Sequence, residues 1–308
     1  MKVIHPQKAT ILGFLRWRLM LGMHTGWPKW IDAQPGLRPV ERVGNGELIV
    51  TFINHATMLL QCDGLNILTD PTWSMRSSPF AWFGPRRVRP PGIRFEDLPP
   101  IDVVLVSHNH YDHMDIPTLR RLEEAHHPLI LVGSKSAGFL KKKGVARTQE
   151  LVTWEQTTIG QTKIHFVPAQ HWSQRTLWDN NKMLWGGFVI EAKYGTIYFA
   201  GDTGYGPFVD EIHERFPKIY LALLPLGSYE PRWMMHKNHI NPQEAVLVHK
   251  RLGARISIGM HFGTFRLGAE TIDDPLADLI AEYAKESVKP DEFITLGFGE
   301  ARKFLPAP

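Results

Sequence analysis

Short hydrophobic runs alternate with amphipathic segments along most of the chain. The segments 47–62 ("ELIVTFINHATMLLQC") and 64–71 ("GLNILTDP") predict two strands joined by a turn at Asp63–Gly64. The segment 101–107, "IDVVLVS", is a continuous apolar run, as expected for a strand that is buried on both faces. Further strands are predicted in "HPLILVG", "TKIHFVP", "GGFVIEA", "GTIYFAGD", "LALLPLG" and "ISIGMHFG".

Helical patterns lie between these strands. The segment 241–253 has Asn241 as a predicted N-cap, followed by proline and then by glutamate three residues past the cap, and it ends at Gly253. Two more helices are predicted, over 273–288, where Asp274 and Pro275 repeat the start signal, and over 134–144. The alternation predicts a mixed α/β fold in which helices cover the sheets of one domain, residues 41–308, after an N-terminal arm, residues 1–40.

The arm contains the most apolar stretch of the chain, residues 9–31. Arg16 and Arg18 interrupt it, so it falls short of the roughly 20 apolar residues that a membrane span needs, and it does not fit a signal peptide. Two interpretations stay open: a helix lying in a membrane interface, and an arm packed on the protein's own surface. We therefore expect a cytoplasmic protein, with peripheral contact to the inner face of the membrane as an open alternative.

Composition narrows the function classes. The 308 residues are 43% hydrophobic and 21% charged, which is typical of a soluble globular protein. The single cysteine, Cys62, excludes an intrachain disulfide and a cysteine-rich zinc site. The net charge of +4 favours anionic partners such as phosphates or acidic lipids. No basic stripe with interleaved aromatic residues is present, so we expect no nucleic-acid partner.

The candidate chemistry begins directly after the strand predicted in 101–107. His108, His110, Asp112 and His113 lie within six positions, and imidazole and carboxylate groups are the usual zinc ligands where cysteine is absent. Residues two apart in an extended segment point the same way, so His108 and His110 can converge on one ion. Asp112 and His113 lie past the turn and can serve a second ion. This density favours a metal site over an incidental polar loop.

Three more residues occupy the same kind of position. His171, Asp202 and His261 each follow a predicted strand. A single histidine at a strand end is a weak signal, but together these residues supply one extra ligand for each ion and an anionic bridge. The pattern predicts a two-metal hydrolytic site.

The motif "SHNHYDHMD" has the H-x-H-x-D-H form of the metallo-β-lactamase superfamily, and "PAQHW", "AGDTGY" and "HFGTF" follow in that superfamily's order. Within it, "TDPTWSMRSSP", "GPRRVR", "HWSQRTLWDNNKMLWGG" and "LPLGSYEPRWMM" resemble the N-acylphosphatidylethanolamine-hydrolysing phospholipase D family, and the similarity covers roughly residues 48–304. The resemblance implies a four-layer αββα sandwich of the metallo-β-lactamase type. Phe262, where we expect tryptophan in animal members, and the N-terminal arm depart from the family pattern.

The resemblance also implies roles for individual residues. One zinc ion is expected on His108, His110 and His171, and a second on Asp112, His113 and His261, with Asp202 bridging; manganese or iron are alternatives. Asp70 is expected to orient ligands from behind, and His55 to pack close to the site. His239 matches a family histidine near the substrate phosphate and joins Asp112 and Asp202 as a catalytic residue.

The implied reaction is hydrolysis of N-acylphosphatidylethanolamine, or a related lipid, to N-acylethanolamine and phosphatidic acid by a metal-bridging hydroxide. Residues 73–100 read as a long functional loop. The substrate-binding candidates, with simple packing as the other interpretation, are Trp82, Arg86, Arg87 and Trp172. The main alternative function is a metallo-hydrolase of a soluble ester, a lactone or a cyclic phosphate. A nuclease and a non-catalytic metal-binding protein are less favoured, and a homodimer stays open.

Overall fold

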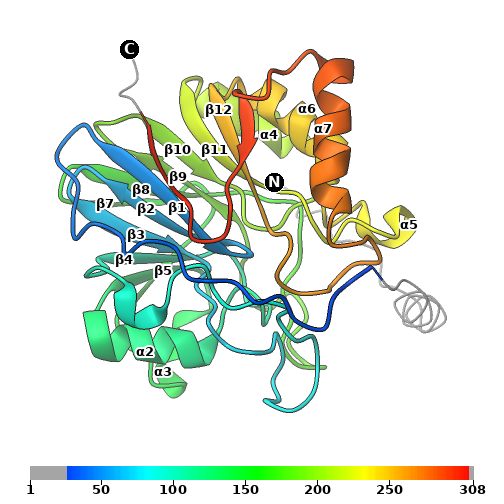
Figure 1. Ribbon diagram of the computed structural model, residues 1–308. Helices are drawn as coiled ribbons and strands as arrows, with labels where there is room; N and C mark the ends of the chain where they lie inside the picture. Colours follow the sequence, from blue (N-terminus) through cyan, green and yellow to red (C-terminus); the bar gives the residue numbers. More distant parts are fainter. Residues whose placement is uncertain (1–25, 305–308) are drawn as a thin grey trace.

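The computed structural model describes residues 26–304 as two seven-stranded sheets packed face to face, with helices on their outer faces (Figure 1). This arrangement confirms the predicted four-layer αββα sandwich. Each sheet is mixed, with three antiparallel and three parallel strand pairs.

The first sheet has the order β14 (Ala301–Phe304), β1 (Leu48–Asn54), β2 (Thr57–Cys62), β3 (Leu65–Thr69), β4 (Val103–Val106), β5 (Leu129–Gly133) and β6 (Thr148–Leu151). The second has the order β13 (Phe293–Thr295), β12 (Ile256–Met260), β11 (Ile219–Pro225), β10 (Thr196–Phe199), β9 (Gly187–Glu191), β8 (Thr162–Val167) and β7 (Gln156–Ile159). The strands from β3 to β6 and from β10 to β13 run parallel to their neighbours, so polar residues at their carboxyl ends gather at one edge of each sheet.

Helices flank both sheets. The first sheet carries α2 (Ile116–His126), α3 (Ala137–Lys142) and the short η1 (Phe95–Asp97), and the second carries α4 (Phe208–Arg215), α6 (Pro242–Leu252) and α7 (Asp274–Glu286). The four-residue α5 (Arg232–Met235) lies in the loop after β11. In Figure 1, α2 and α3 lie on one side of the sandwich and α4, α6 and α7 on the other.

Strand β4 shows why the layers hold together. Its residues alternate between two hydrophobic clusters: Val103 and Leu105 face the core between the sheets, whereas Val104 and Val106 face the layer formed with α2 and α3. All four are fully or nearly fully buried. Burial of such a side chain contributes roughly 1.5–3 kcal/mol, so the continuous apolar run is stabilised from both faces, as predicted.

One predicted strand was wrong. The segment 47–62 is not a single strand but β1 and β2, which pair antiparallel around a tight turn at His55 and Ala56. His55 has the left-handed backbone conformation, with φ 49°. The turn was not predicted because apolar residues continue on both sides of it. The predicted turn at Asp63–Gly64 is present between β2 and β3.

The predicted helices are largely confirmed. Helix α6 has the full capping box: the Asn241 side chain accepts from the Glu244 N–H, and the Glu244 side chain accepts from the Asn241 N–H. Helix α7 begins at Asp274, so its N-cap is Asp273 and not the predicted Asp274. The Asp274 carboxylate accepts from the Thr271 N–H instead, at 2.7 Å.

Several elements were not predicted. The hydrophobic pattern gave no strand for β6, β7, β13 and β14 and no helix for α2, α4 and α5. Strands β6 and β7 are polar in sequence, and β14 is mostly exposed, so none of the three carries a strong apolar signal. These strands form because they extend sheets that other strands have already established.

The described part of the arm, residues 26–40, lies along the segment 86–92. The Ile31 N–H donates to the Val88 carbonyl at 2.6 Å, and the Gly36 N–H donates to the Gly92 carbonyl at 2.7 Å. A Cβ atom on Gly36 would lie 2.1 Å from the Gly299 carbonyl oxygen, so only glycine fits at this crossing. The predicted interfacial segment 9–31 lies mostly outside the described residues, and the division into residues 1–40 and 41–308 stays a prediction.

No helix within residues 26–304 combines the length and the apolar character needed to cross a membrane.

Candidate metal centre

The predicted ligands come from loops that follow four strands. His108, His110, Asp112 and His113 follow β4 in the first sheet. In the second sheet His171 follows β8, Asp202 follows β10 and His261 follows β12. Close contacts join all seven side chains in one cluster built from loops of both sheets, and all of them except the partly buried His110 are buried. The seven residues predicted as metal ligands therefore lie together, although they come from loops after four different strands.

His108, His110 and His171 form the first donor set, with one ring nitrogen of each within 4.8 Å of the others. His108 Nε2 lies 2.8 Å and His171 Nε2 lies 3.2 Å from His110 Nδ1. The other nitrogens of two rings are held from behind. His171 Nδ1 donates to the Asn238 carbonyl at 2.9 Å. Ser107 Oγ lies 2.9 Å from His108 Nδ1, and it donates its own proton to Asp70 Oδ2 at 2.6 Å.

These contacts fix the tautomers. A serine hydroxyl has one proton, and because the Ser107 proton goes to Asp70, the hydroxyl oxygen must accept from His108 Nδ1–H. His108 and His171 therefore carry their protons on Nδ1 when neutral. The lone pairs on Nε2 then point toward His110 and the centre of the cluster.

His55, Asp112, His113 and His261 form the second donor set, which also spans no more than 4.8 Å. His113 Nε2 lies 3.2 Å from His261 Nε2 and 3.3 Å from Asp112 Oδ2. His113 Nδ1 donates to Asp70 Oδ2 at 2.6 Å, so this ring is also held by a partner outside the set. His261 Nε2 lies 3.6 Å from Asp112 Oδ2.

Asp202 lies between the two sets. Its carboxylate oxygens are 3.1 Å from His113 Nε2 and 3.1 Å from His261 Nε2. They are 3.9 Å from His108 Nε2 and 3.9 Å from His171 Nε2. A single carboxylate thus faces both sets and lies closer to the second.

In the first set burial lowers the pKa of every histidine, whereas in the second set the pKa values of His113 and His261 are raised and only that of His55 is lowered by burial, to about 3. Burial and neighbouring imidazoles lower the pKa of His108 well below its usual value. Burial also lowers the pKa of His171 well below its usual value and that of His110 to about 4.

In the second set the aspartates outweigh burial. Burial alone would lower the pKa of His113, but Asp202, Asp112 and Asp70 raise it well above its usual value. For His261 burial is likewise outweighed by Asp202 and Asp112, which raise its pKa to about 9. Burial alone would raise the pKa of Asp112 and Asp202, yet the adjacent histidines hold both well below the usual range.

The donor set fits one or two transition-metal ions. Facing Nε2 lone pairs repel one another unless a cation lies between them, and two nitrogens bound at 2.0–2.1 Å to a tetrahedral zinc ion are about 3.3 Å apart. The observed nitrogen separations of 2.8–3.2 Å are close to that value. Among the described residues, His110 Nε2, His261 Nδ1 and Asp202 Oδ1 are buried without a hydrogen-bond partner. The cluster therefore has the chemistry of a metal site and is poorly satisfied as a hydrogen-bond network alone.

The remaining predicted residues differ in their distance from this cluster. The Asp70 carboxylate joins Ser107 to His113, as expected of an orienting residue. The His239 ring lies 5.1 Å from that of His171, and its Nδ1 lies 3.8 Å from Asp202. The Trp172 ring lies 4.4 Å from that of His110.

Within residues 26–304, the predicted substrate-binding residues of the loop 73–100 make no hydrogen bond, ion pair or ring contact with the donor sets. Trp82 is 76% exposed and packs against Phe83. Arg86 is exposed, beside the Trp30 ring. Arg87 is 1% exposed, and its guanidinium donates to the carbonyls of Thr72 and Ser74. A substrate-binding role for Trp82 and Arg86 stays a prediction. For Arg87, burial of the guanidinium argues against binding of a substrate phosphate.

Three contributors were missed from the sequence. Ser107 orients His108, and the Asn238 main-chain carbonyl orients His171. Arg175 donates to the carbonyls of Asn109 and Met114, which braces the loop that carries His110 and His113. Only the position of Ser107 next to His108 gave a signal, because the other two act on main-chain atoms or through them.

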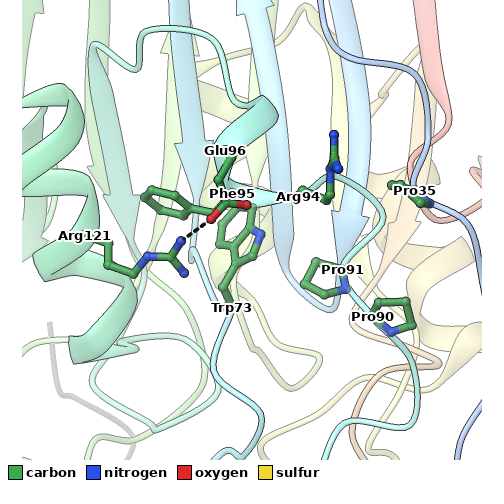
Figure 2. A pocket seen from close by; sticks show the side chains of 8 residues that line it. All are labelled: Pro35, Trp73, Pro90, Pro91, Arg94, Phe95, Glu96 and Arg121. Atoms are coloured by element: carbon green, nitrogen blue, oxygen red, sulfur yellow. Dashed lines mark hydrogen bonds and ion pairs between the residues drawn. The ribbon is translucent and has the colours of Figure 1, made fainter.

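A separate pocket of 330 Å³ opens near α2 (Figure 2). There the Arg121 guanidinium stacks over the Phe95 ring at 3.8 Å and pairs with Glu96 at 2.8 Å. Trp73 and three prolines complete the apolar wall. Most of its lining comes from the predicted functional loop 73–100, but none of the predicted metal ligands lines it, and we assign no chemistry to it.

Comparison with known proteins identifies the family. The sequence pattern of the Beta-lactamase superfamily domain matches residues 65–262. The chain is 37% identical over 268 residues to N-acyl-phosphatidylethanolamine-hydrolyzing phospholipase D 1 of Caenorhabditis elegans, covering 82% of this chain and 75% of the nematode protein. It is also 38% identical over 243 residues to the mitochondrial N-acyl-phosphatidylethanolamine-hydrolyzing phospholipase D of Saccharomyces cerevisiae. This alignment covers 76% of this chain but only 52% of the yeast protein.

A solved structure agrees at the level of fold. A possible metal-dependent hydrolase from Veillonella parvula superposes with a TM-score of 0.68 at 17% sequence identity, covering 83% of this chain and 99% of that protein. The fold is therefore of the metallo-β-lactamase type, as predicted. The chain belongs to the metallo-β-lactamase superfamily, in the sequence family of the N-acyl-phosphatidylethanolamine-hydrolyzing phospholipases D, and is a metal-dependent hydrolase.

Proposed function

We propose that this protein is a binuclear zinc-dependent phosphodiesterase that cleaves N-acylphosphatidylethanolamine, or a closely related lipid, to N-acylethanolamine and phosphatidic acid. The observation that carries the proposal is a pair of buried donor sets that share Asp202, in a chain 37% identical to the nematode phospholipase D. A shared aspartate suits phosphoester chemistry, because two cations held close together can neutralise the charge of a phosphodiester.

His108, His110 and His171 would hold one zinc ion, and Asp112, His113 and His261 the other, with Asp202 serving both. When bound, such a pair of ions lowers the pKa of a water molecule and neutralises charge on a phosphoryl group. Manganese or iron could take the same ligands, since histidine and aspartate suit all three metals.

The protein side chains orient the reactants. Asp112 stays ionised at neutral pH, because the adjacent histidines hold its pKa well below the usual range, so its carboxylate can accept a hydrogen bond from the attacking water and orient it. Its side chain is 12% exposed, more than the side chains of His113, His261 and Asp202. Burial lowers the pKa of His239 to about 4, so this ring is neutral at pH 7 and has one N–H to donate to a phosphate oxygen.

The lipid part of the proposal rests on exposed aromatic side chains. Phe80, Trp82 and Phe83 form a group of packed, mutually tilted rings, each at least half exposed. Together with Trp172 beside His110, they are candidates for contact with acyl chains and with the inner face of a membrane. Cosedimentation of the full chain with anionic liposomes tests this, and equal binding by wild type and Trp82→Ala would remove Trp82 from the lipid-contacting set.

The decisive experiment supplies N-acylphosphatidylethanolamine vesicles to zinc-loaded protein, with Asp202→Asn as the control, and resolves the products by mass spectrometry. We expect N-acylethanolamine and phosphatidic acid from wild type alone. No turnover by protein that holds two metal ions per chain would contradict the lipid assignment. A soluble ester, a lactone or a cyclic phosphate would then be the substrate to test.

A further inference from the structure

His55 is built into the turn between β1 and β2, where the backbone fixes it against the second donor set. The residue is 1% exposed and has a φ of 49°. Its N–H donates to Thr264 Oγ1 at 3.0 Å, and its carbonyl accepts from the His261 N–H at 2.7 Å. The main chain of His55 is therefore tied directly to the segment that carries His261.

The His55 ring is held as firmly as its backbone. Its centroid lies 3.8 Å from that of His261 and 5.3 Å from that of Phe265, which it meets edge to face. Its Nε2 lies 3.0 Å from Asp112 Oδ2. An ionised carboxylate can only accept, so Nε2 carries the proton and donates it to Asp112.

Asp112 Oδ2 is the oxygen that faces the proposed metal ligands, because His113 Nε2 lies 3.3 Å and His261 Nε2 lies 3.6 Å from it. The His55 proton thus reaches the same oxygen from outside the proposed ligand set. A carboxylate oxygen has two lone pairs, so it can accept from His55 and still face a cation. Among the described residues, no other hydrogen bond reaches the Asp112 carboxylate from outside the proposed ligands.

We infer that His55 is the positioning residue for Asp112, and that it sets the affinity of the second metal position without being a ligand. The inference rests on the proposed binuclear centre. The first position has orienting partners of its own, Ser107 for His108 and the Asn238 carbonyl for His171. Loss of His55 should therefore weaken the second position selectively.

A pair of amide variants of the full chain tests this. His55→Gln keeps an N–H donor at about the reach of Nε2, whereas His55→Asn is shorter by one carbon and cannot reach Asp112. Asparagine tolerates the left-handed backbone conformation, so the shorter variant should fold. His249→Gln is a matched control, since His249 is a buried histidine bonded to Ser257 Oγ at 2.8 Å and belongs to neither donor set.

The readout is cobalt(II) titration of metal-free protein, followed by absorbance and metal content. We expect the second metal position of the His55→Asn variant to bind its ion about 10–100-fold more weakly, the usual scale for a lost orienting partner, with the affinity of the first position unchanged. His55→Gln should stay near wild type, and its fully loaded spectrum should match that of wild type. His249→Gln should leave both binding steps unchanged.

Two results would overturn the inference. Wild-type affinity for both ions in His55→Asn would show that Asp112 needs no such donor. A changed ligand-field spectrum in fully loaded His55→Gln would show that His55 is a ligand, and this comparison does not depend on the shorter variant folding. Failure of the proposed function looks different: wild-type protein would bind two ions and leave N-acylphosphatidylethanolamine intact.

Discussion

The two donor sets lie side by side and contain the same kind of ring, yet charge acts differently on them. In the first set every histidine has a lowered pKa, and the orienting partners are neutral, the Ser107 hydroxyl and the Asn238 carbonyl. In the second set the pKa values of His113 and His261 are raised, because three aspartates surround them. In that set only the pKa of His55 is lowered by burial, to about 3. Asp202 is also 3.1 Å from the second set but 3.9 Å from the first.

The difference shows that residue type alone does not define a metal position. Buried imidazoles without carboxylates favour the neutral ring, which is ready to bind a metal but offers no negative charge. Carboxylates at about 3 Å make the second position attractive to any cation, including a proton. We therefore expect the second position to hold its metal more tightly and the first to be emptied first by a chelator.

The largest effect should come from Asp202→Asn, because this carboxylate faces both sets. Activity should fall by more than about 100-fold, beyond the scale seen for a lost orienting partner, and both metal affinities should fall. Steady-state kinetics and metal content by mass spectrometry measure the two effects. Full activity with two bound ions would contradict the shared role.

Asp70→Asn should come next and act mainly on the second position. Asp70 accepts from His113 Nδ1 at 2.6 Å, so its loss frees the ring and should weaken that position about 10–100-fold. Competition with a chromophoric chelator measures this. Asp102→Asn is the matched control, since Asp102 accepts from the Asn66 N–H and pairs with Arg42 away from the centre. A larger loss of metal affinity at the first position than at the second would contradict this prediction.

Ser107→Ala should have a smaller effect than Asp70→Asn, and it should weaken metal binding at the first position and not at the second. The hydroxyl orients His108, and a hydrogen bond of this kind contributes about 0.5–1.5 kcal/mol, which corresponds to roughly a 2- to 10-fold weaker first position. Calorimetric titration of zinc resolves the two steps. Ser136→Ala serves as the control, because Ser136 is also buried but makes no capping hydrogen bond at the start of α3. Equal weakening of both positions would count against separate orienting partners.

Trp172→Phe should have the smallest effect. The indole packs beside His110 at 4.4 Å without holding a ring nitrogen, so both metal affinities should be unchanged and KM should rise only a few-fold. Trp154→Phe is the control, since Trp154 packs against Arg215 away from the centre. A loss of bound metal in the Trp172 variant would show that the first position depends on packing as well as on ligands.

Local patterns predicted most strands of the sandwich and all members of the two donor sets except His55, which was expected only to pack close to the site. The apolar run at 101–107 predicted a strand buried on both faces, and β4 alternates between two hydrophobic clusters as that pattern requires. The cap signals predicted α6 to within a residue. Polar strands such as β6 and β7 escaped prediction because their neighbours, and not their own side chains, place them in the sheets.

The turn at His55 shows most clearly what the sequence patterns could not predict. The sequence carried the histidine but gave no sign that the chain reverses there, since apolar residues continue on both sides. Arg87 is a second case, because its motif suggested phosphate binding whereas its burial ties it to the carbonyls of Thr72 and Ser74. In both cases partners distant in sequence decide what the side chain contacts.

The sequence by itself determined which residues could bind metal, in what order they occur, and that each follows a strand. Only the tertiary structure decided which rings face one another, which nitrogen of each ring is free, and where the negative charge is concentrated. The physical reason is distance along the chain: His55 meets Asp112 across 57 residues, and His113 meets His261 across 148. Periodicity and spacing report on neighbours in sequence, whereas tautomers and pKa values depend on groups that only the packed sheets bring within about 3 Å of each other.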